Sequence, residues 1–128
     1  MQRRPPASVL GWLDAQAPES VWITSVTLFE ARFGLEAMAD GRRKSELQQA
    51  FEALIQQDLA HRVAVFDGRA ADRAAVLAAE RRRKGRPVDI RDAFIAGITL
   101  AHGATLATRN IRHFDDLPVP VINPWDFS

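Results

Sequence analysis

The sequence predicts an α/β fold built on a central, mostly parallel sheet. Short runs rich in β-branched and aromatic residues alternate with longer segments of helical periodicity, an order that is typical of parallel sheets covered by helices. The apolar share of 47% and the charged share of 26% are those of an ordinary globular domain. With 128 residues, the chain is expected to form one domain, residues 1–128, because single cores typically span about 100–200 residues.

Apolar residues spaced three and four apart predict the helices. We expect helices at residues 8–15, 25–39, 42–60, 70–84 and 90–102. Ser25 is predicted to cap the second helix and Asp89 the last, because short polar side chains accept hydrogen bonds from free backbone N–H groups. Gly103 is predicted to end the last helix, since glycine readily adopts the left-handed conformation found there.

Four short runs are predicted to be strands. They cover residues 21–24, 62–66, 104–108 and 120–122. The chain opens with a helix, whereas parallel α/β sheets usually begin with a central strand. We therefore expect a sheet that lacks its first strand.

Composition excludes several classes of protein. The chain has no cysteine, which excludes disulfide scaffolds and thiolate zinc sites. Its longest apolar run, residues 93–101, is too short to span a bilayer, which needs about 20 residues. No secretory signal is visible, so a cytoplasmic protein without membrane association is expected.

Two acidic residues stand out because their neighbours in the sequence are apolar. One comes after a predicted strand, and the other lies at the start of a predicted helix. Glu30 lies between Phe29 and Ala31, and Asp92 precedes an apolar stretch. A carboxylate is costly to bury unless it is paired or bound to a metal. Ligands of parallel sheets gather beyond the carboxyl ends of the strands, so the two acids could together hold a hard cation such as Mg²⁺.

Each acid also has an ordinary structural interpretation. Glu30 could form an ion pair with Arg32 or another arginine. Asp92 lies at a helix start, where the helix dipole favours an acid, although Asp89 is the better capping residue. If both acids are only surface partners, the chain is an α/β domain without this chemistry.

Other chemistries find little support. The three histidines, His61, His102 and His113, lack the spacing of a helical zinc pair, and no serine nucleophile motif is present. The strongest charge run covers residues 81–86. It is interpreted as a solvated helix end or, with Arg91, as a phosphate-binding surface next to Asp92.

The order of several motifs resembles PIN-domain proteins of the VapC toxin type. The segments that carry the resemblance are Ile23-Thr24-Ser25-Val26-Thr27-Leu28-Phe29-Glu30, Val88-Asp89-Ile90-Arg91-Asp92-Ala93-Phe94-Ile95-Ala96-Gly97, Leu106-Ala107-Thr108-Arg109-Asn110, His113-Phe114 and Val121-Ile122-Asn123-Pro124-Trp125. The resemblance covers essentially the whole chain. It implies a PIN-like three-layer α/β/α fold.

The resemblance also implies an activity. It is that of a ribonuclease dependent on Mg²⁺ or Mn²⁺, acting as the toxin of a type II toxin–antitoxin pair, with an RNA substrate, an antitoxin partner and a homodimer. Glu30 and Asp92 fall on the family's metal-binding acids and Asn110 on its fourth polar position, while Asp115 and Asp116 are weaker candidates for that position. The arginines expected to contact RNA are Arg82, Arg83, Arg86, Arg91 and Arg109.

The sequence departs from the family at its start. The family begins with a strand that ends in an Asp-Thr-Asn-type motif, whose aspartate is a metal ligand, and this sequence has no such motif. We therefore expect weak or absent activity from this chain. The alternative function is a catalytically inactive PIN-like binding module that keeps its dimer and antitoxin surfaces.

Overall fold

The computed structural model describes residues 7–126 of the chain, apart from the side chains of residues 10 and 18. Its five main helices are α1 (Ala7–Ala15), α2 (Ser25–Glu36), α3 (Arg42–Ala53), α4 (Gly68–Arg83) and α5 (Ile90–His102). The helices predicted from the sequence are therefore confirmed, with ends that differ by a few residues. Short helical turns complete them: η1 (Pro18–Ser20), the π-helical turn η2 (Leu54–Asp58), η3 (Ile111–Phe114) and η4 (Pro124–Asp126).

The strands form two parallel pairs. β1 (Ile23–Thr24) pairs with β2 (Val63–Ala64), and β3 (Leu106–Ala107) pairs with β4 (Val121–Ile122). Ile23 lies opposite Val63, and Leu106 lies opposite Val121. The parallel direction is as predicted, but each strand is two residues long, and within the described residues the two pairs are separate sheets.

Capping side chains explain where the helices begin. Asp89 accepts hydrogen bonds from the backbone N–H groups of Arg91 and Asp92, so its predicted role is confirmed. Gly103 ends α5 with a left-handed φ of 57°, also as predicted. The prediction for Ser25 was wrong, because Thr24 caps α2 and Ser25 accepts instead from the backbone N–H of Phe66 near β2.

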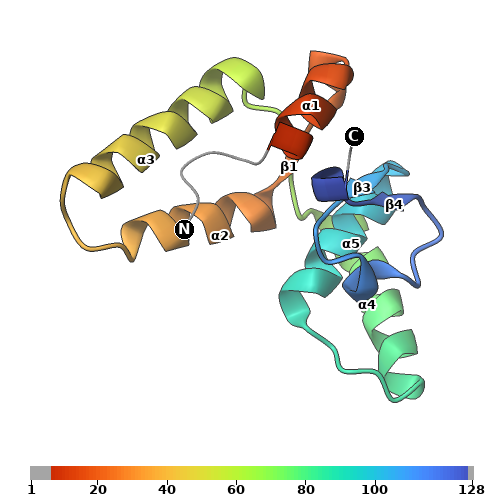
Figure 1. The fold of residues 1–128 in the computed structure, drawn as a ribbon. Coiled ribbons are helices and arrows are strands. Elements are labelled where there is room, and N and C mark those ends of the chain that lie inside the picture. The colour runs from red at the N-terminus through yellow and green to blue at the C-terminus, as the bar shows by residue number, and fades with distance from the viewer. Residues whose placement is uncertain (1–6, 127–128) are drawn as a thin grey trace.

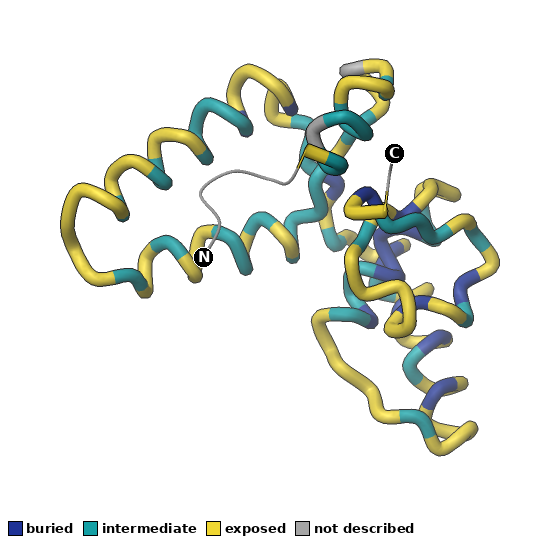
Figure 2. The backbone as a smooth tube through the Cα atoms, in the orientation of Figure 1, coloured by how far each residue is buried: buried dark blue, intermediate teal, exposed yellow. Residues whose placement is uncertain are grey.

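The core lies around α4, α5 and the C-terminal strands. Figure 2 shows buried residues gathered there, while the α2–α3 hairpin, seen in Figure 1, is mostly exposed and contains no buried residue among those described. The main core cluster consists of Leu77, Ala96, Leu106, Phe114 and Leu117. Phe114 and Leu117 fix the loop after β3 on the helices, which places its neighbours beside the start of α5.

Small residues allow α4 and α5 to lie close together. A Cβ atom added at Gly97 would come within 2.8 Å of the Ala74 Cβ and would also collide with the Ala70 carbonyl oxygen. Ala70 is fully buried. This close contact fixes α5, and with it the position of Asp92 in its first turn. Within the described residues, no helix is long and apolar enough to cross a membrane.

Candidate metal and nucleic-acid site

Glu30 projects from α2 toward the start of α5. Its Oε2 atom lies 3.3 Å from an Nη1 nitrogen of Arg91, the second residue of α5. Its side chain is 38% exposed, so water reaches the carboxylate. The predicted ion pair of Glu30 is therefore present, but its partner is Arg91 and not Arg32, which binds Glu52 on α3.

Asp92 lies beside Arg91 in the first turn of α5. Its Oδ2 atom is 3.0 Å from Nδ1 of His113, and its side chain is only 21% exposed. Because Asp89 supplies the side-chain cap of this helix, the carboxylate of Asp92 is not used for capping. Glu30 and Asp92 thus both lie at the N-terminal end of α5, with Arg91 as the link between the helices.

Asn110 belongs to the same cluster through the backbone. Its carbonyl oxygen accepts from the N–H of His113 at 3.0 Å, and its own N–H donates to the Thr108 hydroxyl. His113 therefore contacts Asn110 with its backbone and Asp92 with its imidazole. The role of Glu30, Asp92 and Asn110 in catalysis stays a prediction.

His113 is the site residue to which the sequence analysis gave no role, although His113-Phe114 is one of the segments that carry the resemblance. It lies 21 positions after Asp92, and a separation of that kind carries no motif. Asp115 and Asp116, the weaker candidates, are occupied elsewhere: Asp115 lies 3.0 Å from Arg86 and Asp116 receives two hydrogen bonds from Arg81.

Arg81 corrects the interpretation of the basic run as a solvated helix end. Only 3% of this residue is exposed, and its guanidinium donates to both carboxylate oxygens of Asp116 at 2.8 and 2.9 Å and to the carbonyl oxygen of His113 at 2.8 Å. These hydrogen bonds lower the pKa of Asp116 and raise the pKa of Arg81, against the opposing effect of burial. The pair fixes the loop that carries His113.

The five arginines predicted to contact RNA differ in how exposed they are and in whether an acidic side chain already pairs with them. Arg82 and Arg83 are exposed at the end of α4. Arg86 is neutralised by Asp115 and lies 3.4 Å from Asp116, and Arg91 is paired with Glu30. Arg109 lies over the ring of Trp125, 5.6 Å from its centre.

The donor set fits a hard divalent cation with an incomplete protein shell. The described residues contain no group of three or more histidine, aspartate or glutamate side chains arranged for a metal. They do bring two carboxylates to one end of α5. The Glu30 carboxylate lies next to the guanidinium of Arg91, and the Asp92 carboxylate lies next to the imidazole of His113. One or two carboxylates with water and substrate phosphate are the usual ligands of Mg²⁺, so Glu30 and Asp92 suit it.

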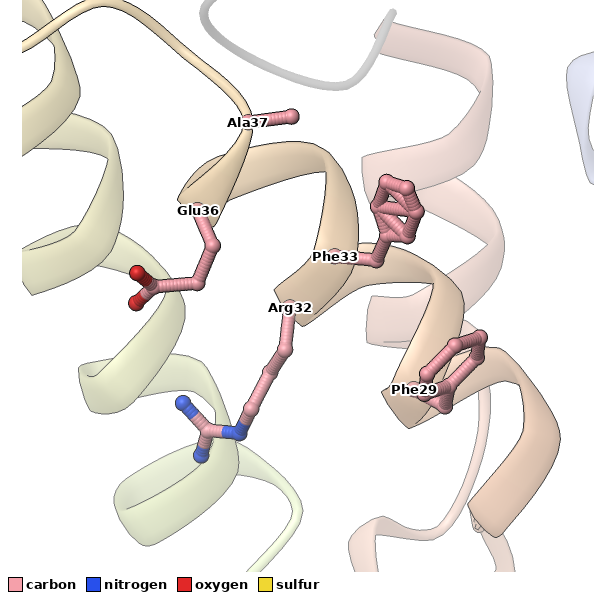
Figure 3. Close-up of a pocket in the computed structure, with 5 residues that line it drawn as sticks. All are labelled: Phe29, Arg32, Phe33, Glu36 and Ala37. Carbon is pink, nitrogen blue, oxygen red and sulfur yellow. The ribbon is translucent and has the colours of Figure 1, made fainter.

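A separate hollow of about 510 Å³ lies along α2 from Phe29 to the C-terminal end of the helix. Figure 3 shows the rings of Phe29 and Phe33 on one side of this helix, while Arg32 and Glu36 point toward α3. The two rings are 61% and 57% exposed and meet edge to face. Neither Glu30 nor Asp92 lines the hollow, so the acids form a surface cluster next to it.

Comparison with known proteins identifies the family. The PIN-domain model matches residues 2–119. The chain is a PIN-domain protein of the VapC type. One relative, the plasmid stability protein StbB of Pseudomonas syringae pv. tomato, is 40% identical over 98% of this chain and 90% of its own length. Another is the VapC ribonuclease Y4jK of Sinorhizobium fredii, 37% identical over 95% of this chain and 87% of its own length.

Solved PIN-domain structures confirm the predicted α/β fold. The structure described as FitAB bound to an IR36 DNA fragment has a TM-score of 0.86 and 30% sequence identity, over 98% of this chain and 89% of that one. The short strand pairs and their helices thus belong to the PIN fold, as the sequence motifs predicted.

Proposed function

We propose that this PIN domain is a metal-dependent endoribonuclease, a VapC-type toxin that hydrolyses RNA phosphodiester bonds. The observation that carries the proposal is the meeting of Glu30 with Arg91, directly beside Asp92, which brings two acids from different helices to one end of α5. The relative named as a VapC ribonuclease supports the reaction class. Mg²⁺ or Mn²⁺ is the proposed cofactor.

The residues of this chain have separate roles in the proposed reaction. Glu30 and Asp92 would hold the cation, and Asn110 would offer a neutral oxygen from the adjacent loop. A cation bound there would help to form the attacking hydroxide and would neutralise charge on the phosphate. His113 would orient the Asp92 carboxylate.

The RNA backbone would approach across the exposed end of α4. Arg82 and Arg83 are the arginines best placed to attract phosphates, since Arg86 is already paired with an acid. Arg91 is paired with Glu30, and Arg109 directly precedes Asn110 in the chain, so both are proposed to contact the phosphate close to the cleaved bond. Attraction of this kind carries no sequence information, so it supports RNA binding without naming the target.

We also propose an antitoxin partner and a homodimer. The structure neighbour described as FitAB is a complex, which supports a protein partner for this chain. The exposed rings of Phe29 and Phe33 support the same proposal, because soluble proteins seldom leave large adjoining apolar side chains without a partner.

Cleavage of a labelled single-stranded RNA in the presence of Mg²⁺ or Mn²⁺ tests the proposed activity. We expect Asp92→Asn and Glu30→Gln each to lower the rate at least about a hundredfold, since several kcal/mol of charge stabilisation would be lost. The matched controls are Asp72→Asn and Glu80→Gln on the exposed face of α4, which should leave the rate unchanged. Equal rates in all five proteins would overturn the assignment, and absence of cleavage by the unaltered chain would favour the inactive binding module.

A further inference from the structure

Arg81 is almost fully enclosed, yet it lies only two residues before the end of α4, where Arg82 and Arg83 are exposed. It projects from α4 into the loop after β3, where it bonds the Asp116 side chain and the His113 backbone. A planar guanidinium binds both oxygens of one carboxylate with two parallel hydrogen bonds and donates to a third acceptor in a fixed geometry, whereas a lysine ammonium is a single point of charge without this fork. The three hydrogen bonds fix both the middle and the end of this loop.

His113 transmits the position of that loop to Asp92. Its carbonyl oxygen is held by Arg81 at 2.8 Å, while its imidazole Nδ1 lies 3.0 Å from Asp92 Oδ2. An ionised carboxylate only accepts hydrogen bonds, so Nδ1 must carry the hydrogen. The orientation of this ring therefore depends on the backbone that Arg81 holds.

We infer that Arg81 is a positioning residue for Asp92, acting through His113. The inference rests on the proposed function, because Asp92 matters as a metal ligand only there. Partners that orient a metal ligand typically change metal affinity about 10–100-fold when they are removed. The competing explanation is that Arg81 only stabilises the fold, since Phe114 and Leu117 already anchor the same loop in the core.

The ¹⁵N NMR chemical shifts of the two imidazole nitrogens of His113 distinguish these explanations without any metal. In a neutral imidazole one nitrogen carries the hydrogen and the other accepts, so the two shifts report which nitrogen faces Asp92. In Arg81→Lys the two shifts should move toward those of Asp92→Asn, which removes the acceptor charge. The signals of His61 and His102 should stay in place, and Arg82→Lys is the matched control on the exposed side of the same helix.

Mn²⁺ binding provides the second readout. In Arg81→Lys the Kd should rise about tenfold or more. In a His113→Ala background the same substitution should have no further effect, because the connecting side chain is gone. Asp116→Asn keeps the arginine. It should change the His113 nitrogen chemical shifts and the Kd for Mn²⁺ in the same directions as Arg81→Lys, but by less. This variant replaces Arg81→Lys in both experiments if Arg81→Lys fails to fold.

The possible outcomes separate the inference from the proposed function. Wild-type nitrogen shifts in folded Arg81→Lys and Asp116→Asn would overturn the positioning role, as would an equal rise in Kd with and without His113. If neither the unaltered chain nor Asp92→Asn binds Mn²⁺, the metal-dependent function fails, and the nitrogen shifts still decide whether Arg81 positions the Asp92 contact.

Discussion

The imidazole of His113 lies 3.0 Å from the carboxylate of Asp92, joining the loop after β3 to the first turn of α5. In the same turn, Arg91 reaches the Glu30 carboxylate on α2. Both candidate metal ligands therefore have a nitrogen partner supplied by this chain. A cation that binds them would compete with these partners or share the acids with them.

The contact between Arg91 and Glu30 predicts that one substitution changes the affinities for metal and for RNA in opposite directions. Arg91→Gln should lower the Kd for Mn²⁺ by a few fold, because a positive charge near Glu30 opposes a second cation. The same substitution should weaken RNA binding, since it removes a phosphate partner. Calorimetry with Mn²⁺ alone and fluorescence anisotropy with RNA measure the two effects, and Arg109→Gln is the control that should change RNA binding only. Weaker Mn²⁺ binding in Arg91→Gln would contradict this prediction.

The close contact of α4 and α5 predicts opposite effects for two glycine substitutions. Gly97→Ala should destabilise the fold by about 1–3 kcal/mol, because the added methyl group meets Ala74 and the Ala70 backbone. Gly34→Ala, within α2 and with nothing near its added Cβ, should stabilise by about 0.5–1 kcal/mol. Thermal and urea unfolding measure both changes. A Gly97→Ala protein as stable as the unaltered chain would show that the helices are further apart than described.

The Arg81–Asp116 pair predicts how stability depends on acid. Folding lowers the pKa of Asp116. The ion pair therefore adds fully to the free energy of unfolding above the unfolded-state pKa of about 3.9, and this stabilisation is lost as the pH falls through the lower pKa of the folded state. Asp116→Asn should be less stable at neutral pH by about 3 kcal/mol, and the difference from the unaltered chain should shrink below about pH 4.

Urea unfolding of the two proteins across this pH range checks the sign. Glu80→Gln, on the exposed face of α4, is the control that should show no comparable difference. A stability gap that stays constant or widens on acidification would mean that Asp116 does not interact with Arg81 as a charged group.

The basic residues at the end of α4 predict a salt-dependent affinity for RNA. The logarithm of the binding constant should fall linearly with the logarithm of salt concentration, with a slope of roughly 0.7 for each phosphate that is neutralised on a single strand. The double variant Arg82→Gln and Arg83→Gln should flatten this slope more than Arg86→Gln, because Arg86 is already paired with Asp115. A slope unchanged in the double variant would mean that these arginines are only a solvated helix end.

Local signals in the sequence predicted the helices and their ends. Asp89 and Gly103 act where they were expected to act, because capping depends on a few adjacent residues. The cap of α2 was misassigned by one residue, since Thr24 and Ser25 can both accept a hydrogen bond and the tertiary contact with Phe66 takes up Ser25. The strands proved shorter than their apolar runs.

The candidate site was predictable only in part. Glu30 and Asp92 were found because acids next to apolar residues are uncommon and because they fall in motifs that resemble the PIN family. The partners that hold them, Arg91 and His113, depend on how separate elements pack, and no spacing in the sequence encodes that. Arg81 was misjudged for the same reason, because its burial comes from a loop more than 30 residues later.

Titration of the folded chain with Mn²⁺, followed by electron paramagnetic resonance, tests the shared cation most directly. We expect one Mn²⁺ per chain, a Kd at least tenfold higher in Glu30→Gln and in Asp92→Asn, and unchanged binding in Asp72→Asn. Unchanged Mn²⁺ affinity in both site variants would contradict a cation shared by these two acids.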